Sequence, residues 1–109
     1  LAAVRINADG TLDTSFDSNG LKLIGRMGSD ASTSAQGMYK VNGGFLITAS
    51  SGGGSFFNDK PAAVKIDESG DIVTSWGTSG WIVNSRATSG GYPEYFTVTS
   101  SDVWSKTYI

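Results

Sequence analysis

The side chains that this chain lacks limit the chemistry it can perform. Its 109 residues contain no histidine and no cysteine. Ser-His-Asp and Cys-His nucleophilic catalysis are therefore excluded, and so are disulfides and thiolate metal sites. The 10 Asp and Glu residues lie mostly in predicted turns, and no pair at strand ends indicates glycoside hydrolysis. We therefore predict that the chain is not an enzyme and carries no cofactor.

Oxygen-bearing side chains near the start of the chain form a first candidate ligand group. Asn7, Asp9 and Asp13 lie close together in sequence, and clustered carboxylates suit calcium. Their spacing differs from the EF-hand pattern, and a related segment later in the chain has Ser69 and Val73 at the corresponding positions. We therefore interpret this group as a hairpin turn whose side chains cap the backbone, and predict no metal site.

Aromatic side chains form the second candidate group. Phe16 and Trp76 occupy equivalent positions of two similar segments, so we predict that both are core anchors. Five other aromatic residues would either stack on sugar rings or bury themselves against a neighbouring subunit: Phe56, Phe57, Trp81, Tyr92 and Tyr95. Exposed aromatic clusters usually mark interfaces, and for Phe56, Phe57 and Tyr92 we favour the interface.

The overall composition indicates one β-rich domain, residues 1–109, with little charge. Glycine occurs 15 times, 39% of the residues are hydrophobic and 17% are charged, which favours strands and turns over helices. A net charge of −2 gives no electrostatic reason to bind nucleic acid or anionic membranes. No apolar stretch has the length of a transmembrane helix, so we predict no membrane insertion.

The elements that would position these groups recur along the chain. Residues 2–24 align without a gap with residues 62–84. Identical residues occur at Ala2, Ala3, Val4, Ile6, Gly10, Thr14, Ser15 and Gly20. A period of 60 residues with strand-like content indicates stacked or radially arranged β units. We therefore predict two 60-residue repeats in which residues 1–24 and 62–84 are equivalent.

Alternating apolar and polar residues predict the strands of each unit. Residues 2–7 and 62–67 are predicted as half-buried strands, each followed by a turn that ends in glycine. Return strands are predicted at 11–16 and 71–76, with short apolar extensions at 21–24 and 81–83. A second hairpin is predicted at 38–41 and 45–49 around Asn42-Gly43-Gly44, and a diverged copy of it at 95–99 and 103–109. Residues 50–55 are predicted to be a flexible connector.

Residues 3–16, with the sequence Ala-Val-Arg-Ile-Asn-Ala-Asp-Gly-Thr-Leu-Asp-Thr-Ser-Phe, resemble the delta-60 repeat of bacterial β-propellers. That repeat is built around a strand, an N-x-D-G turn and an L-D-x-S-F segment. Residues 43–49 with 63–70, and residues 103–108, look similar to related repeats of secreted propellers. The resemblance implies a propeller fold and an extracellular or cell-surface location in bacteria, and it transfers no catalytic residue. Members of that family carry many repeats in one chain, whereas this chain has fewer than two.

We therefore expect an all-β fold of antiparallel, four-stranded, propeller-like units, about two in number, with a two-sheet β-sandwich as the alternative. One unit is divided between the two ends of the chain, so its free halves would pair with each other or with neighbours. The expected partner is a second copy of the chain or the remainder of a longer propeller. The expected function is a non-catalytic scaffold or interaction module of a bacterial surface or secreted protein. The alternative is a carbohydrate-binding module that uses loop aromatics.

Overall fold

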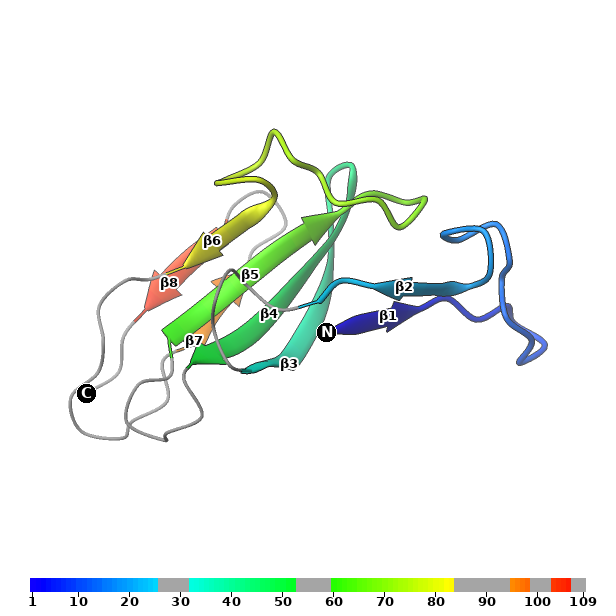
Figure 1. The fold of residues 1–109 in the computed structure, drawn as a ribbon, viewed down its shortest axis with the longest axis horizontal. Coiled ribbons are helices and arrows are strands. Elements are labelled where there is room, and N and C mark those ends of the chain that lie inside the picture. Colours follow the sequence, from blue (N-terminus) through cyan, green and yellow to red (C-terminus); the bar gives the residue numbers. More distant parts are fainter. Residues whose placement is uncertain (26–31, 53–59, 84–94, 99–102, 107–109) are drawn as a thin grey trace.

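Antiparallel strands form all the regular structure of the described residues (Figure 1). The structure is a computed structural model that describes residues 1–25, 32–52, 60–83, 95–98 and 103–106. No helix occurs within these ranges, so the predicted all-β class is confirmed. The strands are β1 (Ala2–Val4), β2 (Leu21–Leu23), β3 (Ser32–Val41), β4 (Gly44–Gly52), β5 (Lys60–Ile66), β6 (Trp81–Val83), β7 (Tyr95–Val98) and β8 (Val103–Lys106). They form a four-stranded sheet, β3-β4-β5-β6, and two-stranded sheets β1-β2 and β7-β8.

The β3–β4 hairpin is the predicted Asn-Gly hairpin, and its strands are longer than predicted. The strands meet where Val41 faces Gly44. At their far end, residues 50–52, predicted as part of a flexible connector, continue β4 and pair with β3 and β5. Ser51 is fully buried there, and its hydroxyl lies 2.9 Å from that of Thr33 on the adjacent strand. Cross-strand hydroxyl pairs of this kind allow polar residues to continue a buried strand.

The fourth strand of the large sheet differs from the prediction. Residues 71–76 do not form a return strand; they contribute an isolated bridge in which Ile72 faces Ile66. The strand that pairs with β5 is β6, where Trp81 faces Val64. The reason is a turn: Trp76 N–H donates to Val73 O at 3.0 Å, and Gly80 N–H donates to Trp76 O at 2.8 Å. These bonds fold residues 73–80 back on themselves, which leaves the following apolar residues to complete the sheet.

The segment that contains β1 and β2 has the same backbone pairing as the segment that contains β5 and β6, which lies sixty residues later in the chain. Ala3 faces Lys22 in β1-β2, and Ala63 faces Ile82 in β5-β6. The isolated bridges Ile6–Leu12 and Ile66–Ile72 correspond in the same way. Six further backbone hydrogen bonds recur with a shift of sixty; in the first segment their donors are Arg5, Asn7, Gly10, Asp13, Phe16 and Gly20. The two segments therefore share most of their local backbone fold despite many sequence differences. They differ in the turn before β6, where only the second segment has a bridge between Thr78 and Trp81.

The core lies between the first segment and one face of the four-stranded sheet. Cross-strand neighbours Ile47, Val64 and Trp81 share that face. The buried cluster consists of Ala3, Phe16, Ile24, Ile47, Val64, Ile66 and Trp81. Phe16 is 2% exposed, which confirms its predicted role as a core anchor. The same prediction is wrong for Trp76, its counterpart, which is only half-buried and does not belong to the core cluster.

Candidate functional site

The most unusual surface of the described structure is an exposed apolar face on β1, β2 and the turn between them. We call it the N-terminal apolar face and define it by the side chains of Val4, Ile6, Leu12, Leu21 and Leu23. Their exposed fractions are 48%, 61%, 51%, 36% and 73%. Single exposed apolar residues are ordinary, but a contiguous group of this size usually marks an interaction site.

Strand geometry explains why this face is exposed. Successive side chains in a strand point to opposite sides, and in β1 it is Ala3 that is buried against the large sheet while Ala2 and Val4 point away from it. The predicted alternation is therefore present, but the buried side is the one that carries Ala3. The larger apolar side chains on the opposite side of this strand, those of Val4 and Ile6, are left on the surface.

The same positions in the second segment are buried. Val64 and Ile66, which correspond to Val4 and Ile6, have no exposed surface, and Trp81, which corresponds to Leu21, is 9% exposed. They are buried because Phe16 and Ala3 of the first segment pack against them in the core cluster. The chain thus contains one covered and one uncovered version of the same surface.

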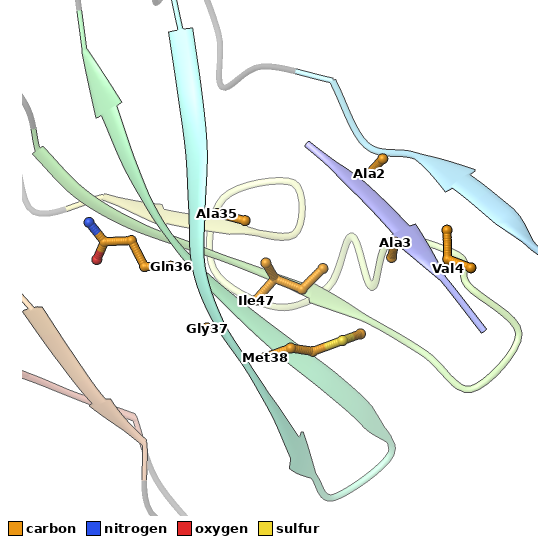
Figure 2. Close-up of a pocket in the computed structure, with 8 residues that line it drawn as sticks. All are labelled: Ala2, Ala3, Val4, Ala35, Gln36, Gly37, Met38 and Ile47. Carbon is orange, nitrogen blue, oxygen red and sulfur yellow. The ribbon is translucent and has the colours of Figure 1, made fainter. Parts of the chain in front are cut away.

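An apolar cleft of about 340 Å³ adjoins this face, between β1 and β3. Figure 2 shows β1 on one side of it, β3 on the other and Ile47 of β4 between them. The lining residues are Ala2, Ala3, Val4, Ala35, Gln36, Gly37, Met38 and Ile47. Gln36 lies at a β-bulge where the pairing of β3 with β4 shifts register. It has the only polar side chain among these residues, and that side chain extends away from β1 (Figure 2). The cleft offers no acid, base or nucleophile, so its chemistry is limited to apolar and backbone contacts.

The backbone of β1 adds a second means of binding. Among the described strands, β1 pairs only with β2, whereas its counterpart β5 lies between β4 and β6. An unpaired strand edge presents N–H and C=O groups to an incoming strand. The exposed apolar face and the open edge of β1 therefore lie on the same small element.

Charged side chains gather at a different place, where the first segment meets the second. Arg5 Nε donates to Asp13 Oδ2 at 2.8 Å, and its Nη2 donates to Ser15 Oγ at 2.7 Å. Its Nη1 donates to the carbonyl oxygen of Glu68, and its guanidinium carbon lies 5.2 Å from the centroid of the Phe16 ring. The Ser15 hydroxyl and then Arg5 hold the pKa of Asp13 below its ordinary value of 3.8. Each of the three guanidinium nitrogens of Arg5 donates to a partner within the protein, so we assign this network a structural role.

The carboxylates proposed above as turn caps perform that function. Asp9 Oδ1 accepts hydrogen bonds from the Thr11 hydroxyl at 2.6 Å and from Thr11 N–H at 3.0 Å, and these bonds lower the pKa of Asp9. Asp13 Oδ1 binds Ser15 in the same way. The predicted hairpin turn with a capped backbone is confirmed here. Within the described ranges, no group of three or more metal-ligating residues lies together.

The five aromatic residues predicted as ligand or interface residues do not form one site in the described structure. Trp81 lies in β6 and is part of the core cluster. Tyr95 lies in β7, opposite Lys106 of β8. Phe56, Phe57 and Tyr92 lie outside the described residues. Sequence reasoning missed the N-terminal apolar face; its signal was the alternation that places Val4 and Ile6 on one side of the strand.

Comparison of the chain with protein-family models, with curated proteins and with solved structures finds no match. None of the described residues belongs to a helix that is long and apolar enough to cross a membrane. The fold and the surface therefore define a class only: an all-β protein with an uncovered apolar face.

Proposed function

We propose that this chain is a non-catalytic interaction module that assembles with other units of its own kind through the N-terminal apolar face. One observation carries this proposal. Val4 and Ile6 are 48% and 61% exposed, whereas Val64 and Ile66, at the same positions of the second segment, are fully buried. A surface that is covered in one segment and bare in the other is suited to a partner that resembles its own cover.

The assembly that we propose is of the β-propeller type, in a bacterial surface or secreted protein. The resemblance of residues 3–16 to the delta-60 repeat supports this, as do the four-stranded antiparallel sheet and the backbone bonds that recur after sixty residues. In this proposal the β1-β2 pair and the β7-β8 hairpin are the two halves of one further four-stranded unit. Pairing between these halves from different copies would cover the open edge of β1.

The alternative, a carbohydrate-binding module, requires aromatic rings that are accessible to a sugar. The ring of Trp81 is packed in the core, with 9% of the residue exposed. Of the two functions, we therefore propose the interaction module.

Light scattering over a concentration series tests the proposal. We expect the mass to rise from that of one chain, 11.4 kDa, to a multiple of it as concentration increases. The variant Val4→Asp should remain at the mass of one chain, because it would bury a charge in the interface. Tyr39→Asp is the matched control: Tyr39 is 42% exposed but lies on β3, outside the N-terminal apolar face. A dissociation constant of about 1 mM corresponds to a binding free energy of about −4 kcal/mol. A wild-type protein that stays monomeric up to about millimolar concentration would therefore refute self-assembly.

A further inference from the structure

We propose that the N-terminal apolar face of one copy receives the side chain of Trp76 from a second copy, in the way that the second segment receives Phe16 within one chain. This inference rests on the proposed self-assembly and names its contact. The internal contact serves as the template, because each of its two halves occurs a second time, uncovered, on the same chain.

The internal contact has an apolar part and a backbone part. The ring of Phe16 lies over Gly70, where an added Cβ would be 3.0 Å from Cε2 of the ring. Beside the ring, the N–H of Asp17 donates to the carbonyl oxygen of Ser69 at 2.8 Å. Arg5 donates to the next carbonyl, that of Glu68. These bonds fix the position in which Phe16 enters the core.

The receiving half of this contact is present again around Gly10. Gly10 and Gly70 have similar positive φ angles, 87° and 96°. The bond from Gly10 N–H to Asn7 O, 3.0 Å, corresponds to that from Gly70 N–H to Asp67 O, 3.2 Å. The two turns differ in what lies above the glycine: the Phe16 ring lies above Gly70, whereas a Cβ added at Gly10 would meet no atom within 4 Å. The first turn therefore has the shape that holds Phe16 in the second turn, and the space above it is open.

The receiving groups do not depend on the side chains that differ between the two turns. Ser69 and Glu68 accept hydrogen bonds through their carbonyl oxygens, and Asp9 and Ala8 have the same carbonyls at the corresponding positions. The apolar floor is also conserved in character, because Val4 and Ile6 correspond to Val64 and Ile66. The N-terminal apolar face can thus accept an aromatic ring without any change in the backbone.

The inserting half of the contact is present again at Trp76. Phe16 N–H donates to Asp13 O at 3.0 Å, and Trp76 N–H donates to Val73 O at the same distance. The bond that precedes Phe16 and the bond that closes its turn at Gly20 therefore recur around Trp76, with Lys65 in the place of Arg5. The backbones differ just after the ring, where a bridge between Thr78 and Trp81 occurs in the second turn only. Trp76 is half-buried, whereas Phe16 is 2% exposed. The larger indole ring retains surface that a second copy would cover.

The ion pair at the internal contact has no counterpart in the proposed one. Lys22 Nζ lies 3.6 Å from Asp71 Oδ1 across the internal contact, and these positions correspond to Ile82 and Thr11. Because the Asp71 side chain is 71% exposed, this pair contributes little. The proposed contact is thus more apolar than its internal template.

Such a contact is heterologous, because the inserting and receiving surfaces are different parts of the chain. Each copy then has one surface of each kind available for a neighbour. Copies joined in this way form a closed ring or an open filament rather than a two-fold dimer.

Two variants that each remove one half of the contact test this inference. Trp76→Ser removes the inserting ring, and Ile6→Asp places a charge on the receiving face at a residue that is 61% exposed in one chain. Each variant alone should associate at least about 30-fold more weakly than wild type, the effect of losing a central aromatic anchor. Trp76→Phe should retain assembly, because phenylalanine occupies the equivalent position 16. Circular dichroism establishes that each variant keeps its strands.

Mixing the two variants distinguishes this contact from other modes of assembly. An Ile6→Asp copy still has Trp76, and a Trp76→Ser copy still has an intact receiving face, so a 1:1 mixture should form a dimer of the two variants and nothing larger. If wild type assembles and Trp76→Ser assembles equally well, or if the mixture stays monomeric, the Trp76 contact is wrong while self-assembly stands. If wild type does not assemble, the proposed function itself fails. If Trp76→Ser loses its strands, retention of full assembly by Ile6→Asp still overturns the inference.

Discussion

At the scale of single residues, Arg5 and Asp13 join the first segment to the second. Asp13 accepts hydrogen bonds from Ser15 and Arg5, and Arg5 also binds the backbone of Glu68. Val73 stands at the corresponding position of the second segment, so this carboxylate network belongs to the first segment alone. It ties the turn that carries Phe16 to the turn that receives the ring.

The network makes stability depend on pH in a defined direction. The pKa of Asp13 in the folded protein lies below its ordinary value of 3.8. Its ionised form therefore stabilises the fold above pH 3.8, and this contribution is lost as pH falls through the folded-state pKa. We expect Asp13→Asn to unfold at lower urea concentration than wild type at neutral pH, and the difference to shrink well below pH 3.8.

Asp71→Asn is the control for this comparison. Its carboxylate is 71% exposed and lies 3.6 Å from Lys22, so its removal should change stability little at neutral pH. A difference between Asp13→Asn and wild type that stays constant to the lowest pH would show that the ionised carboxylate is not the stabilising species.

At the scale of elements, the β3–β4 hairpin depends on one glycine. Gly44 has a φ of 149°, and a Cβ added there would collide with the carbonyl oxygen of Ile66 on β5. The neighbouring strand is backbone at this point and has no flexible side-chain end that could move aside. The hairpin therefore packs against β5 only because residue 44 has no side chain.

Replacement of this glycine should weaken the whole sheet. We expect Gly44→Ala to lower the free energy of unfolding by about 3 kcal/mol or more, since both overpacking and backbone strain act at this residue. The measurement is urea denaturation followed by circular dichroism. Gly25→Ala is the matched control, because Gly25 also has a positive φ, 80°, but nothing lies within 4 Å of an added Cβ. That variant should lose only about 1–2 kcal/mol, and equal losses in the two variants would contradict the packing argument.

Local patterns predicted the strands and turns better than they predicted which segments pair. The Asn-Gly signal located the β3–β4 hairpin, and alternation located β1 and β5. The prediction of return strands at 11–16 and 71–76 was wrong. Backbone hydrogen bonds around Phe16 and Trp76 close turns there, and alternation of apolar and polar residues does not reveal such turns. The continuation of β4 to Gly52 depends on the hydroxyl pair of Ser51 and Thr33, a contact between residues distant in sequence.

At the scale of the whole molecule, the exposure of the N-terminal apolar face depends on which side of β1 packs against the second segment. The residue pattern of one strand does not reveal this. The sequence placed Val4 and Ile6 on one side of a strand. Their exposure follows from the packing of Ala3 and Phe16 against the second segment. Likewise, Trp81 lies in a glycine-rich stretch of the sequence, where we expected an aromatic residue at the surface. It is buried because β6, the strand that begins with it, completes the large sheet.

The apolar character of the N-terminal face predicts how assembly responds to salt and temperature. Its side chains carry no charge, so added salt, which shortens the screening length from about 10 Å at 0.1 M to about 3 Å at 1 M, should leave association unchanged or stronger. Burial of apolar surface should give a negative heat-capacity change. Dilution calorimetry at several temperatures and salt concentrations measures both quantities. Steep weakening by salt would indicate instead that charged groups such as Lys65 hold the copies together.

The spacing of sixty residues between the two segments also restricts the stoichiometry of any closed assembly. One copy contributes the complete sheet β3-β4-β5-β6 and, under the proposed pairing, the two halves of one more unit, β1-β2 and β7-β8. A ring formed by copies of these 109 residues alone would therefore contain an even number of four-stranded units, and the order of its rotational symmetry would be half that number. Under this pairing, a ring built only from these 109 residues cannot contain an odd number of four-stranded units, whatever the strength of its contacts.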